Sequence, residues 1–413
     1  MIRNISLKTC SGLLDLAVGF STRVLVVASF GSFSAAYSAE IELLPSPASE
    51  RSSLSRIVSD ESGNLYLSWV MQDGGFAGLF YSTLNGTSWS EPQMISGGDD
   101  WFINWADFPV MSVSSKSKAA NWLRMSAEGT YDYDIDARFY DAESDSWSDA
   151  ITLHKDGVSA EHGFVAMLSV GEGNTLISWL DGRNTKTDAG YGQMTLRAGV
   201  FNARGETLSE WELDSRVCDC CQTSAAMSAA GPVIVYRDRS AEEIRDIYIT
   251  RYTDGIWTSP VAIHDDQWEI AGCPVNGPSV AAKGNFVAVG WFSAKDDSPK
   301  VRLALSSDNG EHFSAPILVA GPDTIGRIDT AILANGQVAV SWLDTTGEET
   351  QLMVSRFSPR GALIDSTVVG RTSASRRSGF PIIEAAGDDL FITWTDTNDG
   401  SAVRIARIHF ASQ

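Results

Sequence analysis

The sequence predicts an all-β fold, a closed β-propeller built from four-stranded blades. A short apolar strand that ends in an aromatic residue occurs seven times, at spacings of 51 to 57 residues. These strands end at or near Trp69, Trp122, Trp179, Tyr236, Trp291, Trp342 and Trp394. Turns rich in Gly, Asn and Asp separate the strands, and the apolar residues do not follow helical spacing. A fixed period of about 50 residues made of short strands is typical of a propeller. We expect seven blades, with six as the alternative count.

Each repeat is long enough for four strands, and the last repeat is one strand short. We expect an inner strand such as 108–113, then the aromatic-ending strand, a third strand such as 301–305 and a fourth such as 316–319. The seventh repeat stops at Phe410, after its third strand. The segment 40–44 precedes the first inner strand and is predicted to supply the missing outer strand, because closing the ring removes exposed sheet edges.

The composition fits one large folded domain and excludes two classes of partner. The chain has 413 residues, of which 43% are hydrophobic, enough for a large core. Acidic residues outnumber basic ones by 52 to 31, and the formal net charge is −21. Nucleic acids and anionic membranes attract basic surfaces, so neither is an expected partner. We expect a small molecule or a glycan as the ligand and a monomer as the oligomeric state.

The first 39 residues differ from the rest and predict a secretory signal. Arg3, Lys8 and Arg23 form a basic region, the segment 24–33 is apolar, and small residues dominate 34–39. The apolar segment is shorter than the ~20 residues that a membrane span needs, and no later segment could span a membrane. We expect cleavage after Ala36 or Ala39, a single propeller domain over 40–413, and a periplasmic or secreted location.

The turn between the third and fourth strands of the fifth repeat carries a family resemblance. Residues 306–313 read Ser-Ser-Asp-Asn-Gly-Glu-His-Phe, which resembles the Asp box of sialidase-like BNR repeats, Ser-x-Asp-x-Gly-x-x-aromatic. Decayed copies occur at 82–89, 145–147 and 253–257. The Asp side chain caps the turn, the glycine takes a positive φ and the aromatic residue packs between sheets. The resemblance implies a sialidase-like propeller, but the box is structural and implies no reaction.

The resemblance also implies a catalytic set that this sequence carries only in part. A sialidase uses an arginine cluster, a tyrosine nucleophile helped by a glutamate, and an aspartic acid as proton donor. The family's Phe-Arg-Ile-Pro start reads Ser-Arg-Ile-Val at 55–58, and no tyrosine follows Tyr252. Tyr131 or Tyr133 could replace the nucleophile only in a rearranged site. We expect a propeller that binds an acidic or glycan-type ligand without a complete sialidase set. A glycan-active hydrolase or lyase is the alternative.

Candidate ligand-binding residues lie where the loops of a propeller converge on one face. These are the loops that precede the first strands and those that join the second and third strands. Guanidinium groups bind carboxylates through two parallel hydrogen bonds, so the arginines of these loops predict an arginine-lined mouth. The candidates are Arg56, Asp107, Glu161, Arg183, Arg237, Arg239 and Arg327.

Four cysteines remain after the predicted signal, and they form the most specific local pattern. Cys218, Cys220 and Cys221 precede one inner strand, and Cys273 precedes the next. We therefore expect them to meet at the mouth. An even count in an oxidising compartment favours two disulfides. Thiolates could instead bind Zn or Cu, with His162 as a nitrogen ligand, which would make the chain a periplasmic metal-binding protein. Free thiols are the third alternative.

Overall fold

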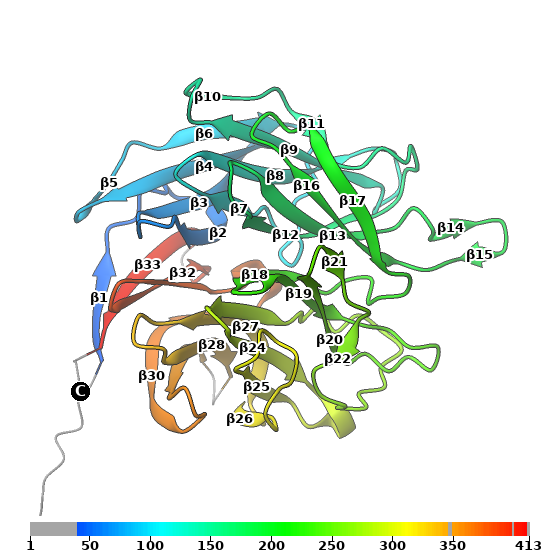
Figure 1. Ribbon diagram of the computed structural model, residues 1–413. Helices are drawn as coiled ribbons and strands as arrows, with labels where there is room; N and C mark the ends of the chain where they lie inside the picture. The colour runs from blue at the N-terminus through cyan, green and yellow to red at the C-terminus, as the bar shows by residue number, and fades with distance from the viewer. Residues whose placement is uncertain (1–38, 346–348, 399, 411–413) are drawn as a thin grey trace, which may run out of the picture. The chain divides into compact units, whose positions relative to one another are not determined.

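The computed structural model describes residues 39–345, 349–398 and 400–410, and over these ranges the protein is a seven-bladed β-propeller. Seven antiparallel sheets of four or five strands form the blades, and one further hairpin stands apart from them (Figure 1). Seven blades, rather than the alternative six, are confirmed.

The first four blades follow one another along the chain. Blade 1 consists of β2 (Ser52–Ser59), β3 (Leu65–Asp73), β4 (Phe76–Asn85), β5 (Ser88–Trp89) and β6 (Gln93–Gly98). Blade 2 consists of β7 (Met111–Val113), β8 (Ser117–Met125), β9 (Tyr133–Asp141), β10 (Ser146–Trp147) and β11 (Ile151–Thr152). Blade 3 consists of β12 (His162–Ser169), β13 (Thr175–Asp181), β16 (Thr195–Phe201) and β17 (Thr207–Asp214), with the hairpin β14 (Lys186–Thr187) and β15 (Gly190–Tyr191) inserted. Blade 4 consists of β18 (Ser224–Ser228), β19 (Gly231–Arg237), β20 (Ile247–Thr253), β21 (Ile256–Trp257) and β22 (Val261–Ala262).

The last three blades complete the ring. Blade 5 consists of β23 (Ser279–Lys283), β24 (Phe286–Ser293), β25 (Lys300–Ser306) and β26 (Ile317–Ala320), with the 3-10 turn η1 (Lys295–Asp297). Blade 6 consists of β27 (Thr324–Ile332), β28 (Val338–Asp344), β29 (Thr350–Phe357) and β30 (Leu363–Thr372). Blade 7 consists of β31 (Ile382–Ala386), β32 (Asp389–Asp396), β33 (Ala402–His409) and β1 (Glu40–Leu44), and is preceded by η2 (Arg376–Ser378).

The N-terminal strand closes the ring, as the sequence predicts. β1 pairs antiparallel with β33, from Glu40 opposite His409 to Leu44 opposite Ile405. The two strands, blue and red, lie side by side in Figure 1. Blade 7 therefore contains strands from both ends of the described chain, which leaves β33 with a partner on each side.

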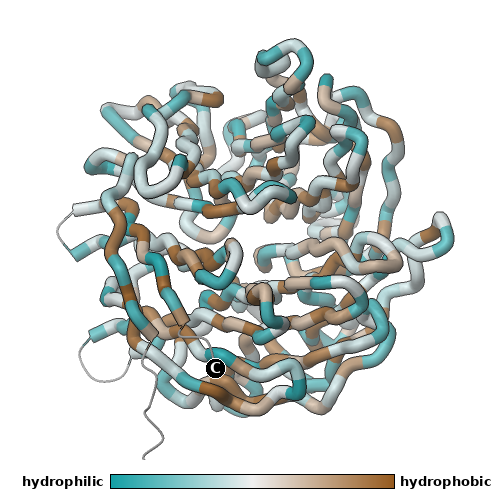
Figure 2. Tube along the Cα trace, turned by 60° about the vertical axis from the view of Figure 1, so that its left-hand side comes forward, coloured by the Kyte–Doolittle hydropathy of each residue, from teal (hydrophilic) through white to brown (hydrophobic). Residues whose placement is uncertain are grey.

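The aromatic residues that end the repeated strands form part of the core between the blades. Each lies on the second strand of its blade, and none is more than 4% exposed. They are Trp69, Trp122, Trp179, Tyr236, Trp291, Trp342 and Trp394. Figure 2 shows hydrophobic residues concentrated along the strands and hydrophilic ones at many of the turns. The repeat seen in the sequence is thus a packing repeat, because one large ring per blade fills the space between sheets.

The turn between β25 and β26 has the contacts expected of an Asp box. The backbone N–H of His312 donates to Asp308 Oδ1 at 3.0 Å, and that of Gly310 donates to Ser306 Oγ at 3.0 Å. Gly310 has a φ of 79°, in the left-handed region that favours glycine. Ser and Asp side chains therefore fix this turn from within.

The predicted signal segment, 1–39, lies outside the described residues except for Ala39. Within the described part of the chain, no helix has the length and hydrophobicity needed to cross a membrane.

Candidate functional site

The first strands of all seven blades surround the central axis. The loops and strand starts on one side enclose a cavity of about 40 Å³, lined by residues such as Asp107, Phe164, Gly277 and Phe380. Toward the other ends of these strands the channel widens to about 510 Å³. The narrower cavity can hold only a few water molecules. A glycan-sized ligand on the loop side would therefore rest largely on the loops around the axis.

Arg56 lies in this channel and not on the outer rim of the mouth. It lines both cavities together with Asp329. Burial lowers the pKa of Arg56, while the charges of Asp329 and Glu384 raise it. Burial raises the pKa of Glu384 to about 7. Arg56 therefore serves as a counter-charge to two carboxyl groups inside the channel.

Two of the arginines predicted to line the mouth, Arg237 and Arg327, use their guanidinium groups for hydrogen bonds within the protein. Arg237 is 2% exposed and donates to the carbonyl oxygens of Arg245, Asn276 and Phe292 at 2.6 to 3.1 Å. Arg327 is 6% exposed. It donates to Ser378 Oγ and to backbone carbonyls within 374–379 at 2.8 to 3.2 Å. These guanidinium groups fasten neighbouring blades together, so they have no donors directed at a ligand.

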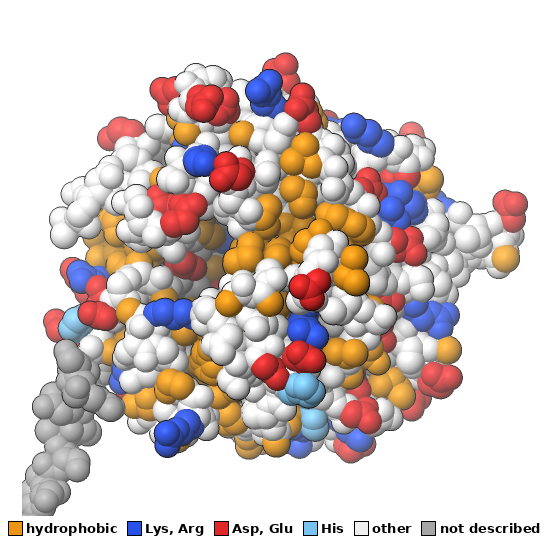
Figure 3. Space-filling model, viewed as in Figure 1, with side chains coloured by type: hydrophobic (Ala, Val, Ile, Leu, Met, Phe, Trp, Pro, Cys, Tyr) orange, Lys and Arg blue, Asp and Glu red, His pale blue; other side chains and the backbone are white. Residues whose placement is uncertain are grey.

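The other two arginines have carboxylate partners within the protein. Arg183 donates through Nε and Nη2 to Asp181 at 2.7 Å each. Arg239 pairs with Asp219 at 3.0 Å and with Glu243 at 2.7 Å. The mouth is therefore lined by neutralised ion pairs and not by a set of unpaired arginines. Acidic and basic side chains are also intermixed on the face of the molecule that Figure 3 shows.

Asp107 and Glu161 meet at one tyrosine. The Tyr133 hydroxyl lies 2.8 Å from Asp107 Oδ2 and 2.9 Å from Glu161 Oε1. A tyrosine hydroxyl has a single proton to donate. One of the two carboxyl groups must therefore be protonated and donate to the Tyr133 oxygen for both hydrogen bonds to form. Burial raises the pKa of Asp107 to about 7 and that of Glu161 to about 8.

Tyr133 itself is not suited to act as a nucleophile. Its side chain is fully buried and stacks on Phe102 with ring centroids 4.2 Å apart. Burial, together with the charges of Asp107 and Glu161, raises the pKa of Tyr133 well above its ordinary value. A nucleophile needs the opposite shift and access to substrate.

Glu161 also lies near charged and exposed groups at the mouth. Asp219 and Cys273 both raise its pKa through their charges, so all three groups lie within electrostatic range of one another. Tyr191, at the end of β15, is 65% exposed, and Glu161, Asp219 and Arg239 all influence the pKa of its hydroxyl. We call Glu161, Tyr191, Asp219 and Arg239 the Glu161 patch. It combines an exposed aromatic ring with charged hydrogen-bonding groups.

The structure brings the cysteines together next to this patch. The Cys218 sulfur lies 2.8 Å from that of Cys221 and 3.9 Å from that of Cys220. Cys273 is exposed, and the neighbouring Cys220 lowers the pKa of the Cys273 thiol. None of these four cysteines, the only ones in the described ranges, is joined in a disulfide here.

Cys218 lies beside a buried cation. Arg245 Nη1 donates to its sulfur at 3.3 Å. Burial opposes ionisation of Cys218, but hydrogen bonds with Cys220 and Cys221 and the charge of Arg245 lower the pKa of this thiol well below its ordinary value. Low-pKa thiolates are the form that binds metals and reacts with electrophiles.

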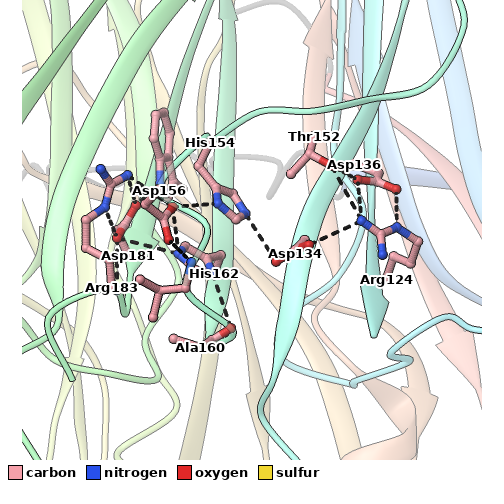
Figure 4. A network of polar contacts seen from close by, with 12 residues as sticks. Arg124, Asp134, Asp136, Thr152, His154, Asp156, Ala160, His162, Asp181 and Arg183 are labelled. Atoms are coloured by element: carbon pink, nitrogen blue, oxygen red, sulfur yellow. Dashed lines mark hydrogen bonds and ion pairs between the residues drawn. The ribbon is translucent and has the colours of Figure 1, made fainter. Parts of the chain in front are cut away.

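His162 does not join the cysteines, contrary to the expectation from sequence. Its Nδ1 lies 3.2 Å from the carbonyl oxygen of Ala160, and its ring stacks on His154 with centroids 3.7 Å apart (Figure 4). Its Nε2 faces Asp156 and Asp181. The reason is the direction of β12, which begins at His162 and turns this side chain into the interior.

Sequence reasoning missed His154, Asp156 and Arg245 as members of these groups, and it considered Tyr133 only as a replacement nucleophile. Tyr133 and Arg245 start or precede third strands, a position that the repeat could have marked as facing the mouth. His154 and Asp156 lie on the connection from β11 to β12, and nothing in their spacing indicates that this segment folds back beside His162.

The described chain forms a closed, seven-bladed β-propeller. The polar groups described above lie mainly on the loops of blades 2 to 5. No protein-family model matches the chain, and no curated protein matches it.

Several solved structures resemble it in architecture. A puromycin-hydrolyzing peptidase of Mycobacterium tuberculosis has a TM-score of 0.50 and 11% identity, over 87% of this chain and 55% of that chain. The phage phi92 endosialidase has a TM-score of 0.49 and 9% identity, over 91% and 70%. A Hadza microbial sialidase has a TM-score of 0.41 and 14% identity, over 71% and 63%. This chain spans about half of the peptidase, and identities this low describe fold alone.

Proposed function

We propose that the protein is an exported propeller that binds a glycan-type ligand on the Glu161 patch without sialidase catalysis. The observation that carries the proposal is the exposed ring of Tyr191, whose hydroxyl lies within electrostatic range of Glu161, Asp219 and Arg239. Sugar rings pack on exposed aromatic faces, and their hydroxyls bond to carboxylates and guanidinium groups. A few polar groups around an apolar surface are typical of small-ligand sites.

A neutral, hydroxyl-rich glycan fits this patch better than an acidic one. Arg239 already pairs with Asp219 and Glu243, and Arg237 and Arg327 donate to backbone and hydroxyl oxygens. An acidic ligand would find no unpaired guanidinium among them, and it would meet the carboxyl groups of Glu161 and Asp219. The sialidase-like repeat resemblance of the Asp box supports a sugar ligand in general terms. The basic, apolar and small-residue regions of 1–39 support export to the periplasm or beyond.

A glycan array with the purified protein tests the proposal. We expect binding to neutral oligosaccharides, weakened about tenfold by Tyr191→Ala, since aromatic contacts contribute about 0.5–1.5 kcal/mol. The matched control is Tyr131→Ala, which removes another exposed tyrosine, 57% accessible, whose ring contacts Phe102 instead. Failure to bind any glycan, or equal losses in both variants, would refute the proposal. Turnover of an aryl sialoside would refute the absence of sialidase catalysis.

A second candidate function is soft-metal binding by the cysteines. The sulfurs of Cys218, Cys220 and Cys221 all lie within 4.8 Å of one another, which favours a shared ion. Thiolates select Cu(I) and Zn. We expect about one Cu(I) per chain at these thiolates, lost in Cys221→Ser, under reducing conditions. A mass lower by two or four hydrogens in the purified protein would show disulfides and refute this function.

A further inference from the structure

A second group of metal-type donors lies apart from the cysteines, at the start of blade 3. His154 and Asp156 lie on the connection from β11 to β12, His162 begins β12, and Asp181 ends β13. Their side chains are at most 5% exposed. We call these four residues the imidazole–carboxylate cluster. Figure 4 shows the two stacked rings between the aspartates, with Asp134 on the other side of His154.

Hydrogen bonds determine which nitrogen of each ring carries the proton. His162 Nδ1 lies 3.2 Å from the carbonyl oxygen of Ala160, and His154 Nδ1 lies 2.8 Å from Asp156 Oδ2. A carbonyl and a carboxylate can only accept, so both Nδ1 atoms donate. In the neutral rings each Nε2 therefore carries a lone pair. A backbone carbonyl or a carboxylate behind the ring is the usual outer-shell partner of a metal-binding histidine.

The lone pair of His162 faces two carboxylate oxygens, and an ionised carboxylate has no proton to donate to it. His162 Nε2 is fully buried, lacks a hydrogen-bond partner, and lies 3.4 Å from Asp156 Oδ2 and 3.6 Å from Asp181 Oδ1. These distances are long for hydrogen bonds. They match two donors on one tetrahedral ion, because bonds of 2.0–2.2 Å place neighbouring donors about 3.3–3.6 Å apart.

The ionisable groups around the cluster have an excess of negative charge, which a bound cation would balance. Four carboxylates, Asp134, Asp136, Asp156 and Asp181, face two guanidinium groups, Arg124 and Arg183. Two negative charges remain when both imidazoles are neutral. Protonating both would place two cations face to face, since the ring centroids are 3.7 Å apart. One divalent ion balances the charge without that repulsion.

The carboxylates are held in position by hydrogen bonds, two of which reach the oxygens that face His162: His154 Nδ1 donates to Asp156 Oδ2 at 2.8 Å, and Arg183 Nε donates to Asp181 Oδ1 at 2.7 Å. Trp179 Nε1 donates to Asp181 Oδ2 at 2.8 Å, and Arg183 donates to both oxygens of Asp181. The backbone N–H of Val158 donates to Asp156 Oδ1 at 2.9 Å. Each carboxylate is therefore oriented before any ion binds, which is the condition for a preformed site.

We propose that His162 Nε2 and the carboxylates of Asp156 and Asp181 bind one divalent transition-metal ion of the zinc class. A ligand set of one imidazole and two carboxylates suits Zn²⁺, Mn²⁺ or Co²⁺, and not the thiol-seeking Cu(I) of the cysteine group. Because Asp156 lies on the connection that leads to Glu161, the ion fixes this loop against β13.

Cobalt spectroscopy of the chelator-treated protein separates this site from the cysteines. We expect one Co²⁺ per chain with visible d–d bands and without the near-ultraviolet charge-transfer band of thiolate ligands. Competition with Zn²⁺ should remove the bands. His162→Gln and Asp156→Asn should each weaken Zn²⁺ binding by at least tenfold, and His154→Gln by about 10- to 100-fold as an outer-shell change.

The matched control is His264→Gln. His264 also faces an aspartate, with Nε2 3.6 Å from Asp266 Oδ1, but has one carboxylate and a half-open environment. This variant should bind Zn²⁺ like the parent protein. Circular dichroism identifies variants that fail to fold, and Asp156→Asn, which keeps the side-chain shape, then carries the test. Absence of Zn²⁺, Co²⁺ or Mn²⁺ binding, or binding that disappears with Cys221→Ser and persists in Asp156→Asn, would overturn the proposal.

Discussion

The three cysteines Cys218, Cys220 and Cys221 and the imidazole–carboxylate cluster both bring together side chains that can bind metals. The two groups differ in the hydrogen-bond partners that the protein gives to these side chains. The Cys218 sulfur accepts a hydrogen bond from Arg245, so the protein supplies a cation of its own. His162 Nε2 is equally buried and has no partner. A buried polar atom without a partner is costly. The two groups therefore differ in one respect: the cysteine thiol has a charged partner within the protein, whereas the imidazole nitrogen has none.

The largest effect should come from breaking the ion pair at the imidazole–carboxylate cluster. Asp181→Ala leaves Arg183 and the Trp179 N–H without their carboxylate. We expect a loss of about 3–5 kcal/mol in the free energy of unfolding, as for a buried pair that loses one partner. Urea unfolding followed by tryptophan fluorescence measures it.

Asp73→Ala is the control for this change. Its partner is Arg51, and the two side chains are 69% and 72% exposed. Exposed pairs contribute little, so we expect no measurable change in stability. Equal losses in Asp73→Ala and Asp181→Ala would show that burial does not separate the two pairs.

A smaller loss should follow at the hydroxyl shared by Asp107 and Glu161. Tyr133→Phe keeps the stacked ring but removes the partner of both carboxyl groups. We expect destabilisation by about 1–3 kcal/mol, the usual cost of buried polar groups left unpaired. Tyr131→Phe, at an exposed ring, should be neutral in the same unfolding assay. A neutral Tyr133→Phe would mean that water replaces the hydroxyl.

The buried carboxyl group of the channel should make stability depend on pH. Burial raises the pKa of Glu384 from 4.5 to about 7. The folded state therefore keeps a proton that the unfolded state releases between these values. Stability is fully present below pH 4.5 and falls as the pH rises through 7. We expect a lower Tm at pH 8 than at pH 5, and a smaller difference in Glu384→Gln.

The effect of Glu384 should be modest because this residue lines the 510 Å³ cavity, where water reduces the cost of its charge. An unchanged pH profile in Glu384→Gln would assign the pH dependence to other carboxyl groups with a raised pKa, such as Asp238, whose pKa burial raises to about 7.

The smallest change in stability, and the clearest change in reactivity, should be found at Cys273. This thiol is exposed and has a lowered pKa, whereas Cys218 and Cys221 are buried. In the native protein we expect one thiol per chain to react quickly with iodoacetamide and the rest to react only after unfolding. Mass spectrometry after timed labelling identifies it. Cys273→Ser should remove the fast phase, and a protein without reactive thiols even when unfolded would contain disulfides instead.

The sequence predicted the repeat but not the partners of the polar side chains. Seven buried aromatic rings, from Trp69 to Trp394, recur at a nearly fixed spacing because each fills the same place between sheets, and this spacing predicts the number of blades. The closing strand 40–44 was predicted because the seventh repeat is one strand short. Arg237 and Arg327 were expected to bind a ligand. Their sequence context is polar, and only three-dimensional packing shows that backbone carbonyls surround them.

The loops of the cysteines precede first strands of adjacent blades, which is why the sequence predicts that they lie together in a propeller. In the structure the sulfurs of Cys218, Cys220 and Cys221 lie within 4.8 Å of one another. His162 was misplaced by the same reasoning. His162 is the first residue of β12 and does not lie on the loop before it. A shift of one residue along a strand moves a side chain to the opposite face. His154 and Asp156 lie on an irregular connection, whose path no periodicity describes.

The pairing of β1 with β33 imposes an order on the assembly of the molecule. Among the described strands, β1 is synthesised first and its partner β33 last, so residues 40–44 have no strand partner while the other blades are made. Contacts this distant along the chain form late and slowly. One strand pair, β1 with β33, therefore closes the ring, and this pair can form only after β33 has been synthesised. A chain cut short before Ala402 would expose β32 as an edge, and such edges promote association between molecules.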